Sequence, residues 1–137
     1  MKKILYILLV SSTLIACDKV YINGDLDGMW KLKSVEYPDS ISYPNHIFYS
    51  FQRHLTQLTK DNDTELPERF LGNLSYYGST LSMSNFQVFP LEPSAATLED
   101  LKIFHLYSDS TTFNIVTLKD ETLIMTSDER TYTLQKW

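Results

Sequence analysis

Residues 111–136, TTFNIVTLKDETLIMTSDERTYTLQK, decide the fold class of this chain. They divide into three short segments, 111–118, 122–127 and 130–136, that are rich in β-branched, aliphatic and aromatic residues. Such residues suit the pleated, half-buried surface of a strand. The two connections between the segments are short and polar, and each contains an Asp-Glu pair, as expected of hairpin turns. We therefore expect three strands in an antiparallel meander.

The same strand-like composition continues through the earlier part of the chain, where turn-forming residues separate four further candidates. Their ranges are 29–37, 46–59, 68–76 and 80–86. In the second of them, a period-2 pattern places four residues on one face, Ile47, Tyr49, Phe51 and Leu55. Gly72 lies within the third candidate and predicts a bulge or bend there. The count is seven strands, or eight if the long second segment is broken.

A different pattern occupies residues 87–107, between these two groups of strands. Two prolines interrupt any strand there. Thr97 and Asp100 have the spacing of a helix N-cap and its partner, and apolar residues then recur with helical spacing. We expect a short helix over residues 98–107, and the competing interpretation is a strand over 101–107.

These elements predict an all-β fold with one short helix near 98–107. Neighbouring strands joined by short turns close most readily into an antiparallel up-and-down barrel, here of seven to eight strands. A two-sheet sandwich shares much of the same pattern and is the alternative. A chain of this length is sufficient for one hydrophobic core, so we expect one folded domain over residues 27–137.

The start of the chain has the organisation of a secretory signal. Two lysines precede an apolar run, and Leu14-Ile15-Ala16-Cys17 ends in the only cysteine of the chain. This tetrapeptide resembles the lipobox of bacterial lipoproteins, in which the cysteine is acylated and becomes the mature N-terminus. The resemblance implies a signal peptide over 1–16, lipidation at Cys17 and a tether over 17–26. It predicts a bacterial envelope protein, anchored in the outer rather than the inner membrane, with its domain in the periplasm or at the cell surface.

Composition and charge restrict the partners. Loss of residues 1–16 leaves 121 residues. It removes two of the 12 basic residues and none of the 17 acidic ones, so the formal net charge falls from −5 to −7. Binding of nucleic acid depends on neutralising phosphates with Lys and Arg, so we expect no nucleic-acid partner. With Cys17 lipidated, the mature domain has neither a disulfide nor a cysteine nucleophile.

Residues 27–32, Asp-Gly-Met-Trp-Lys-Leu, resemble the G-x-W signature on the first strand of lipocalins and other calycin barrels. The last three strand candidates resemble the closing strands of small bacterial lipocalin-like lipoproteins. The resemblance implies that Gly28 and Trp30 are structural, with the tryptophan packed across the closed end of the barrel. True lipocalins cap this tryptophan with an arginine, and Arg130 is the candidate for that position here.

The chain shows no motif for catalysis or for a cofactor. It has neither a nucleophile elbow (G-x-S-x-G) nor an H-E-x-x-H helix, and its four glycines form no phosphate-binding loop. His46 and His54 are ~26 Å apart on an extended segment, too far to share a metal ion. A run of acidic residues lacks the glycine and glutamate of an EF-hand: Asp61, Asp63 and Glu65. We expect no catalytic residue, no metal and no cofactor.

The aromatic residues indicate where a ligand would bind. Four of them are candidates to line the barrel interior: Tyr49, Phe51, Phe70 and Tyr76. A barrel of about eight strands is either filled by its own side chains or holds one small ligand, and both interpretations stay open here. The first function hypothesis is non-catalytic binding of a small apolar molecule. The alternative is an interaction module or inhibitor with a filled barrel, which acts through its outer face and loops and through an apolar patch around Phe86, Phe89 and Leu91.

Two tripeptides, Asp39-Ser40-Ile41 and Asp109-Ser110-Thr111, resemble the pattern used for O-glycosylation of exported proteins in some envelope bacteria. Both lie in predicted turns, where the acceptor serine is accessible. The pattern is short and also arises by chance, so glycosylation of Ser40 and Ser110 is a hypothesis for intact-mass measurement.

Overall fold

The computed structural model describes residues 22–62, 68–89 and 94–137. Its elements in chain order are the 3-10 turn η1 (Gly24–Leu26), β1 (Gly28–Tyr37), β2 (Ser40–Ser42), β3 (Ile47–Gln52), β4 (Leu55–Lys60), β5 (Glu68–Tyr77), β6 (Thr80–Phe89), the helix α2 (Leu98–Lys102), β7 (Ser110–Lys119), β8 (Thr122–Ser127) and β9 (Arg130–Lys136). None of the helical segments in these ranges is long and apolar enough to cross a membrane. The predictions for residues 1–16, Cys17, Asp63 and Glu65 concern positions outside the described residues.

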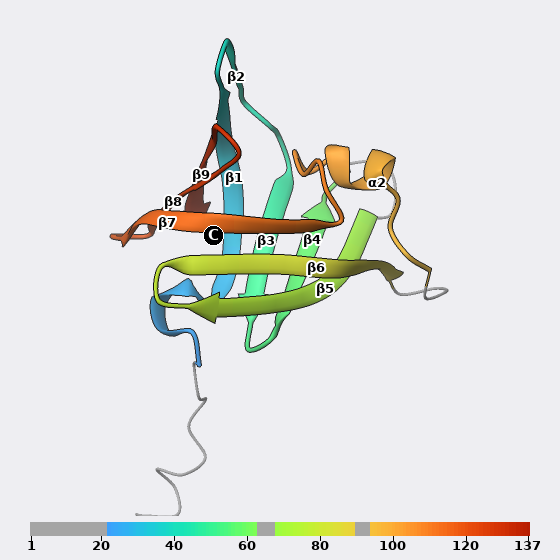
Figure 1. Cartoon of the computed structure of the whole chain (residues 1–137), viewed down its shortest axis with the longest axis horizontal. Coiled ribbons are helices and arrows are strands. Elements are labelled where there is room, and N and C mark those ends of the chain that lie inside the picture. Colours follow the sequence, from blue (N-terminus) through green and yellow to red (C-terminus); the bar gives the residue numbers. More distant parts are fainter. Residues whose placement is uncertain (1–21, 63–67, 90–93) are drawn as a thin grey trace, which may run out of the picture.

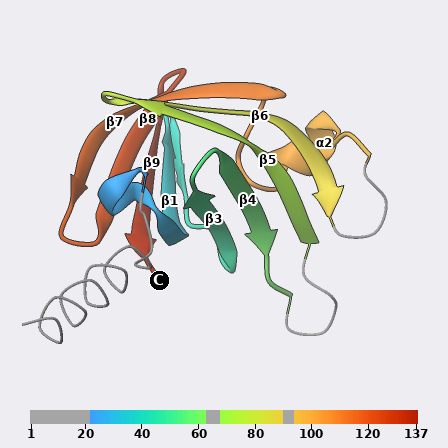
Figure 2. The same cartoon turned by 90° about the horizontal axis from the view of Figure 1, so that it is seen from below.

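The strands form one antiparallel sheet that closes on itself. Its order is β2-β1-β3-β4-β5-β6-β7-β8-β9, and β9 also pairs with β1. Eight strands therefore make a closed barrel, while β2 is an extra strand that forms a hairpin with the far end of β1 (Figure 1, Figure 2). In the closing pair, Trp30 lies opposite Lys136 and Val35 lies opposite Tyr132. The predicted all-β barrel with one short helix is confirmed, and the sandwich alternative is wrong.

The eighth barrel strand arises because a turn at Arg53, with φ 55°, breaks the segment 46–59 into β3 and β4. The inward-facing residues of β3 are buried as predicted, namely Ile47, Tyr49 and Phe51. Leu55, which we predicted on the same face, is instead 48% exposed. The turn shifts the side-chain alternation, so Leu58 takes an inward position in β4, opposite Tyr49.

Gly72 lies in a β-bulge, as its place in the sequence predicted, since the register of β5 against β6 shifts between Leu71 and Asn73. A Cβ atom at Gly72 would lie 2.6 Å from the ring of Phe86, so the absence of a side chain at Gly72 leaves room for this ring against β5. Phe86 is consequently buried. The exposed apolar patch predicted around Phe86 is wrong for this residue, and the side chains of Phe89 and Leu91 lie outside the described part of the chain.

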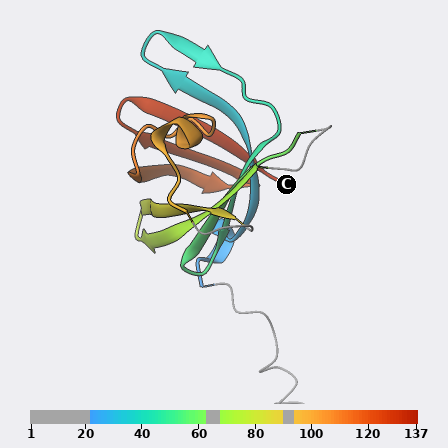
Figure 3. The same ribbon diagram turned by 90° about the vertical axis from the view of Figure 1, so that its right-hand side faces the viewer.

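One continuous hydrophobic core fills the barrel. Its largest fully buried side chains come from β1, β3, β7, β9 and the segment after α2: Trp30, Tyr49, Phe51, Phe104, Phe113 and Tyr132. The two ends of the barrel differ. η1 lies at the end where β1 begins, which we call the closed end. α2 lies toward the other end, from which the β1–β2 hairpin projects and which we call the mouth (Figure 3).

Candidate functional site

The closed end is built around Trp30, whose indole Nε1 donates a hydrogen bond to the carbonyl of Leu26 at 2.8 Å. Leu26 is fully buried, so this end of the predicted tether packs into the fold. The Nζ of Lys136 lies 4.7 Å from the centre of the Trp30 ring, in a cation–π contact. The cation over the tryptophan is therefore Lys136. The prediction of Arg130 for this place is wrong, because β9 begins at the mouth and reaches the closed end only at Lys136.

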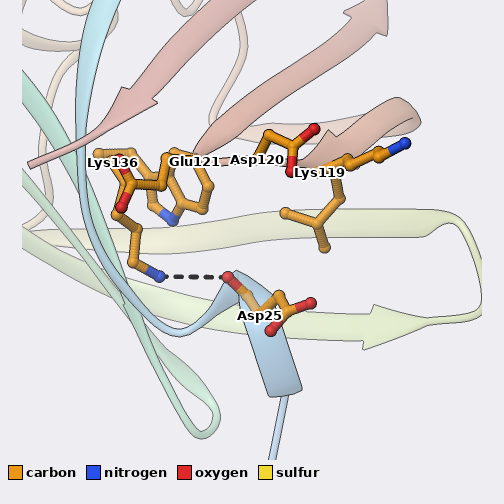
Figure 4. A pocket seen from close by; sticks show the side chains of 7 residues that line it. Asp25, Lys119, Asp120, Glu121 and Lys136 are labelled. Atoms are coloured by element: carbon orange, nitrogen blue, oxygen red, sulfur yellow. Dashed lines mark hydrogen bonds between the residues drawn. The ribbon is translucent and has the colours of Figure 1, made fainter.

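Gly28 makes room for this lysine. It has φ 131°, and a Cβ atom there would lie 2.8 Å from Cε and 2.9 Å from Nζ of Lys136. The Nζ donates to the carbonyl of Asp27 at 2.5 Å. It also donates to the carbonyl of Asp25 at 3.2 Å (Figure 4). The spacing of Gly28 and Trp30 in the G-x-W pattern therefore has a physical explanation in this chain. The missing side chain of Gly28 leaves room for the ammonium of Lys136, which lies over the Trp30 ring.

A half-open cleft of about 240 Å³ lies beside this contact (Figure 4). Its charged lining residues are Asp25, Lys119, Asp120, Glu121 and Lys136. The ring of Trp30 is only 1% exposed, and the ammonium of Lys136 is already held by two carbonyls. Within 22–62, 68–89 and 94–137, no group of three His, Cys, Asp or Glu side chains is placed to hold a metal ion. The contacts of Trp30 and Lys136 described above therefore close this end of the barrel.

The mouth is filled by residues 97–107, which we call the plug. The predicted helix is confirmed at its start, since the Thr97 hydroxyl accepts from the Asp100 amide at 3.2 Å and the Asp100 carboxylate accepts from the Thr97 amide at 2.9 Å. Such a capping box satisfies two amides that a helix start otherwise leaves free. The strand alternative for this segment is wrong, but α2 ends at Lys102, earlier than predicted.

α2 is short because the chain reverses at His105, which has φ 63°. The His105 amide donates to the carbonyl of Lys102 at 3.0 Å, and the Leu106 amide donates to that of Leu101 at 3.1 Å. These two bonds define a Schellman motif, whose left-handed position usually holds glycine. A non-glycine residue there carries about 1–2 kcal/mol of strain. The reversal allows Leu101, Phe104 and Leu106 all to be buried in the core.

Three tyrosine hydroxyls from three strands hold the plug in place. Tyr49 of β3 donates to the carbonyl of Phe104, and Tyr132 of β9 donates to the carbonyl of His105 at 2.5 Å. The hydroxyl of Tyr37 in β1 lies 2.6 Å from Nδ1 of His105. No backbone–backbone hydrogen bond between described residues joins the plug to a strand. Side chains of the barrel therefore hold this segment, and the last backbone bond to a strand before it is that of the Ala96 amide to the carbonyl of Phe86, at 2.9 Å.

The four residues predicted to line a ligand site lie in or beside the core around the plug. Tyr49 binds the plug directly, and the ring of Phe70 packs edge-on against Phe104 with 5.6 Å between ring centres. Phe51 is 1% exposed, and Tyr76 is partly buried against the same core. Two of the four, Tyr49 and Phe70, therefore contact the plug, while Phe51 lies opposite Gly28 at the closed end.

Sequence reasoning missed the polar groups of the mouth. These groups form a ring of contacts that joins Tyr37, His105, Tyr132, Arg130 and Tyr107. The Tyr37 hydroxyl lies 2.6 Å from that of Tyr107, and the Arg130 guanidinium lies 4.7 Å from the Tyr107 ring centre. Arg130 Nε donates to the Tyr132 hydroxyl at 3.0 Å. In the sequence, only the two-residue spacing of Arg130 and Tyr132, which places both on one face of the last strand, indicates this ring. The other members are distant along the chain.

Burial shifts the pKa values of these groups. It raises the pKa of Tyr49, Tyr132 and Tyr37 above the usual value for a phenol, and the nearby charge of Arg130 opposes the shift at each of them. Burial also lowers the pKa of His105. At neutral pH the mouth therefore presents protonated tyrosines, a neutral imidazole and one guanidinium.

A second half-open cleft of about 240 Å³ lies between β6, the plug and the start of β7. Its lining residues are Ser84, Asn85, Phe86, Ala95, Ala96, Leu101, Asp109 and Ser110. Thr111 follows the lining residue Ser110 in the sequence. Its buried hydroxyl has no hydrogen-bond partner among the described residues. Ser110 and Ser40 are both exposed, so both are accessible to the glycosylation that their tripeptides predict.

Comparisons with known proteins agree with this architecture. The family model described as Lipocalin-like domain matches residues 10–137. The fold is similar to the crystal structure of a lipocalin-like protein from Bacteroides uniformis ATCC 8492, with 21% identity, a TM-score of 0.65, and coverage of 83% of this chain and 100% of that one. It is also similar to an uncharacterized protein from Bacteroides eggerthii DSM 20697, with 21% identity, a TM-score of 0.66, and coverage of 82% and 99%. No curated protein matches the sequence.

Proposed function

This chain belongs to the family of lipocalin-like domains, and from that premise we propose that it is a non-catalytic protein that binds a small apolar ligand in the mouth of its barrel. We propose further that the ligand carries a hydrogen-bond acceptor and takes the place of the plug. The observation that supports this most strongly is the set of tyrosine hydroxyls that donate to the two plug carbonyls.

The plug acts as a template for the ligand. Its apolar side chains fill the interior, while its carbonyl oxygens satisfy hydroxyl donors that are buried among aromatic rings. A buried donor left without an acceptor costs about 1–3 kcal/mol. A ligand that replaces the plug must therefore bring both an apolar body and an acceptor.

The volume of the clefts supports the proposal that the plug moves. Pockets that hold ligands of drug size are about 300–1,000 Å³, and each of the two clefts described above offers about 240 Å³. Removal of Leu101, Phe104 and Leu106 from the interior would enlarge the space at the mouth. A helix of one turn is marginal by itself, and among the described residues no backbone–backbone hydrogen bond joins residues 97–107 to a strand.

Calorimetric titration of the purified protein tests this function, with methyl decanoate and decane as probes. Both are apolar, and only the ester carries a carbonyl acceptor. We expect the ester to bind about 2- to 12-fold more tightly, the equivalent of one hydrogen bond of about 0.5–1.5 kcal/mol. The Tyr49→Phe variant removes one donor and is expected to narrow this difference. Failure of both probes to bind would contradict the proposed function.

We also propose that Cys17 anchors the protein in a membrane through acyl chains. Two or more chains hold a protein firmly, because each buried methylene contributes about 0.8 kcal/mol. The mouth lies at the opposite end of the barrel from η1, the last part of the predicted tether (Figure 3).

Intact-mass measurement of the full chain expressed in a bacterial host tests the anchor. We expect the loss of residues 1–16 and the addition of acyl mass at Cys17, with the protein in the membrane fraction. The Cys17→Ser variant is expected to lack the added mass and to leave the membrane fraction. Wild-type protein with an unmodified thiol would refute the anchor.

A second candidate function, an interaction module, is favoured by the β1–β2 hairpin. Among the described strands, β2 pairs only with β1 and has one open edge. Ile41 and Tyr43 are 50% and 76% exposed. Open strand edges and exposed apolar side chains are features of protein-binding surfaces. This candidate becomes the preferred one if the apolar probes do not bind.

A further inference from the structure

Trp137 is a tryptophan that the fold leaves in water, with 71% of its surface exposed. Its amide donates to the carbonyl of Met29 at 2.9 Å, which places it at the closed end, beside the start of β1. Its ring packs edge-on against Phe48, with 5.2 Å between the ring centres, and the Nζ of Lys31 lies 5.2 Å from the Trp137 ring centre. The indole is therefore held in a defined place and still presents most of its surface to solvent.

Three other large apolar side chains are exposed at the same end of the barrel, those of Ile22, Leu55 and Tyr77. Ile22 precedes η1, and Nδ2 of Asn23 donates to the carbonyl of Arg53 at 2.8 Å, so the turn before Leu55 lies next to η1. Tyr77 ends β5, and the turn that follows it lies on the same side of the barrel as η1 (Figure 1, Figure 2). We call Ile22, Leu55, Tyr77 and Trp137 the apolar rim. Groups of exposed apolar side chains mark interaction surfaces.

The charges of the closed end balance, although the chain as a whole is acidic. Four cations and four carboxylates lie there, namely Lys31, Arg53, Lys119, Lys136, Asp25, Asp27, Asp120 and Glu121. The net negative charge of the protein therefore belongs to the rest of the molecule. An end without net charge is repelled less by an anionic surface than the remainder of the protein is.

The predicted anchor brings this end of the barrel to a bilayer. Ile22 is five residues after Cys17 in the sequence. Five extended residues span at most ~18 Å, so acyl chains on Cys17 keep the apolar rim close to the lipid headgroups. Tryptophan and tyrosine gather at this level of a membrane, because their rings are apolar and their N–H or O–H groups stay in contact with water.

We propose that the apolar rim is a membrane-contact surface, with the rings of Trp137 and Tyr77 in the headgroup region of the bilayer that holds the anchor. This proposal rests on the proposed acylation of Cys17 and adds a second contact, which the folded domain makes itself. The ammonium of Lys31 stays at the level of the lipid phosphates, since a lysine packs its stem on apolar surface and keeps its charge in water. In this orientation the mouth, at the opposite end of the barrel, faces away from the bilayer.

Tryptophan fluorescence of the full lipidated chain, reconstituted into vesicles, tests this surface. The vesicles contain equal parts of phosphatidylcholine and phosphatidylglycerol. A matched set carries bromine on the acyl chains near the headgroups, where it quenches an adjacent indole. The chain has two tryptophans, and Trp30 is buried inside the barrel, so quenching by bromine reports on Trp137. We expect the wild-type protein to lose emission in the brominated vesicles.

Two variants give matched controls. Trp137→Phe keeps only Trp30, whose emission is expected to be the same in both sets of vesicles and to show that the variant is folded. Adding Tyr43→Trp to this variant moves the exposed indole to the β1–β2 hairpin at the mouth, because Tyr43 follows β2 and is exposed. We expect no quenching of the moved indole by bromine.

Flotation of the vesicles separates the outcomes. Wild-type protein that floats with the vesicles and is not quenched by bromine would overturn the contact surface and leave the anchor standing. Equal quenching of the indole at the mouth and of Trp137 would overturn the orientation, and with it the assignment of the contact to the apolar rim. Protein that does not float with the vesicles would overturn both the surface and the anchor.

Discussion

Phe104→Ala is expected to lower the free energy of unfolding by about 3–5 kcal/mol, the usual cost of truncating a buried phenylalanine. Phe104 is fully buried and packs edge-on against Phe70, so the substitution opens a cavity in the middle of the mouth. Apolar cavities of this kind stay dry and take up small apolar molecules. We therefore expect benzene to bind the variant and to restore part of the lost stability.

Urea denaturation with and without benzene measures both effects. Leu98→Ala is the matched control, because Leu98 belongs to the same plug and is 50% exposed. Leu98→Ala is expected to change the free energy of unfolding by no more than about 0.5 kcal/mol. A loss of less than about 1 kcal/mol for Phe104→Ala would show that the plug is not part of the core.

Alkaline pH is expected to destabilise the protein steeply, starting near pH 10. Burial raises the pKa of Tyr49 and Tyr132 in the folded state above 10.0, the value of an unperturbed tyrosine. Above pH 10 the unfolded chain releases phenolic protons that the folded state retains. The stability from these two groups is therefore fully present below pH 10 and is lost as the pH rises beyond it. The slope is roughly 1.4 kcal/mol per pH unit for each such tyrosine.

Urea midpoints between neutral pH and about pH 11 measure this slope. Tyr49→Phe removes one of the two groups and is expected to make the decline shallower, although it also loses the hydrogen bond to the plug. Tyr77→Phe is the control, because the Tyr77 side chain is 89% exposed. A decline that is the same in wild type and Tyr49→Phe would contradict the burial of this hydroxyl.

Much of the barrel follows from local pattern. The period-2 alternation and polar turns identify six of the eight barrel strands singly and the other two as one segment, and the spacing of Thr97 and Asp100 identifies the start of α2. The break at Arg53 was harder to see, because a non-glycine residue takes the left-handed conformation there. The end of α2 was missed for the same reason at His105. Turns built without glycine leave a weak signal in sequence.

Sequence patterns did not predict the contacts between side chains in the mouth. Aromatic composition pointed to residues that are buried or partly buried in the core, but it does not say which side chains fill the space between them. The answer depends on long-range contacts, such as that of Tyr49 with the carbonyl of Phe104, across 55 residues of chain. Arg130 illustrates the same limit, since its place against Tyr107 follows from how the plug docks and not from its neighbours in sequence.

In the proposed function, a ligand takes the place of the plug. Amide hydrogen exchange of the protein with and without saturating methyl decanoate tests it most directly. The amides of Leu101, Phe104, His105 and Leu106 are hydrogen-bonded within the plug. We predict that the ligand speeds their exchange while the strand amides stay protected. A bound ligand that leaves these four amides unchanged or slows their exchange would contradict the account.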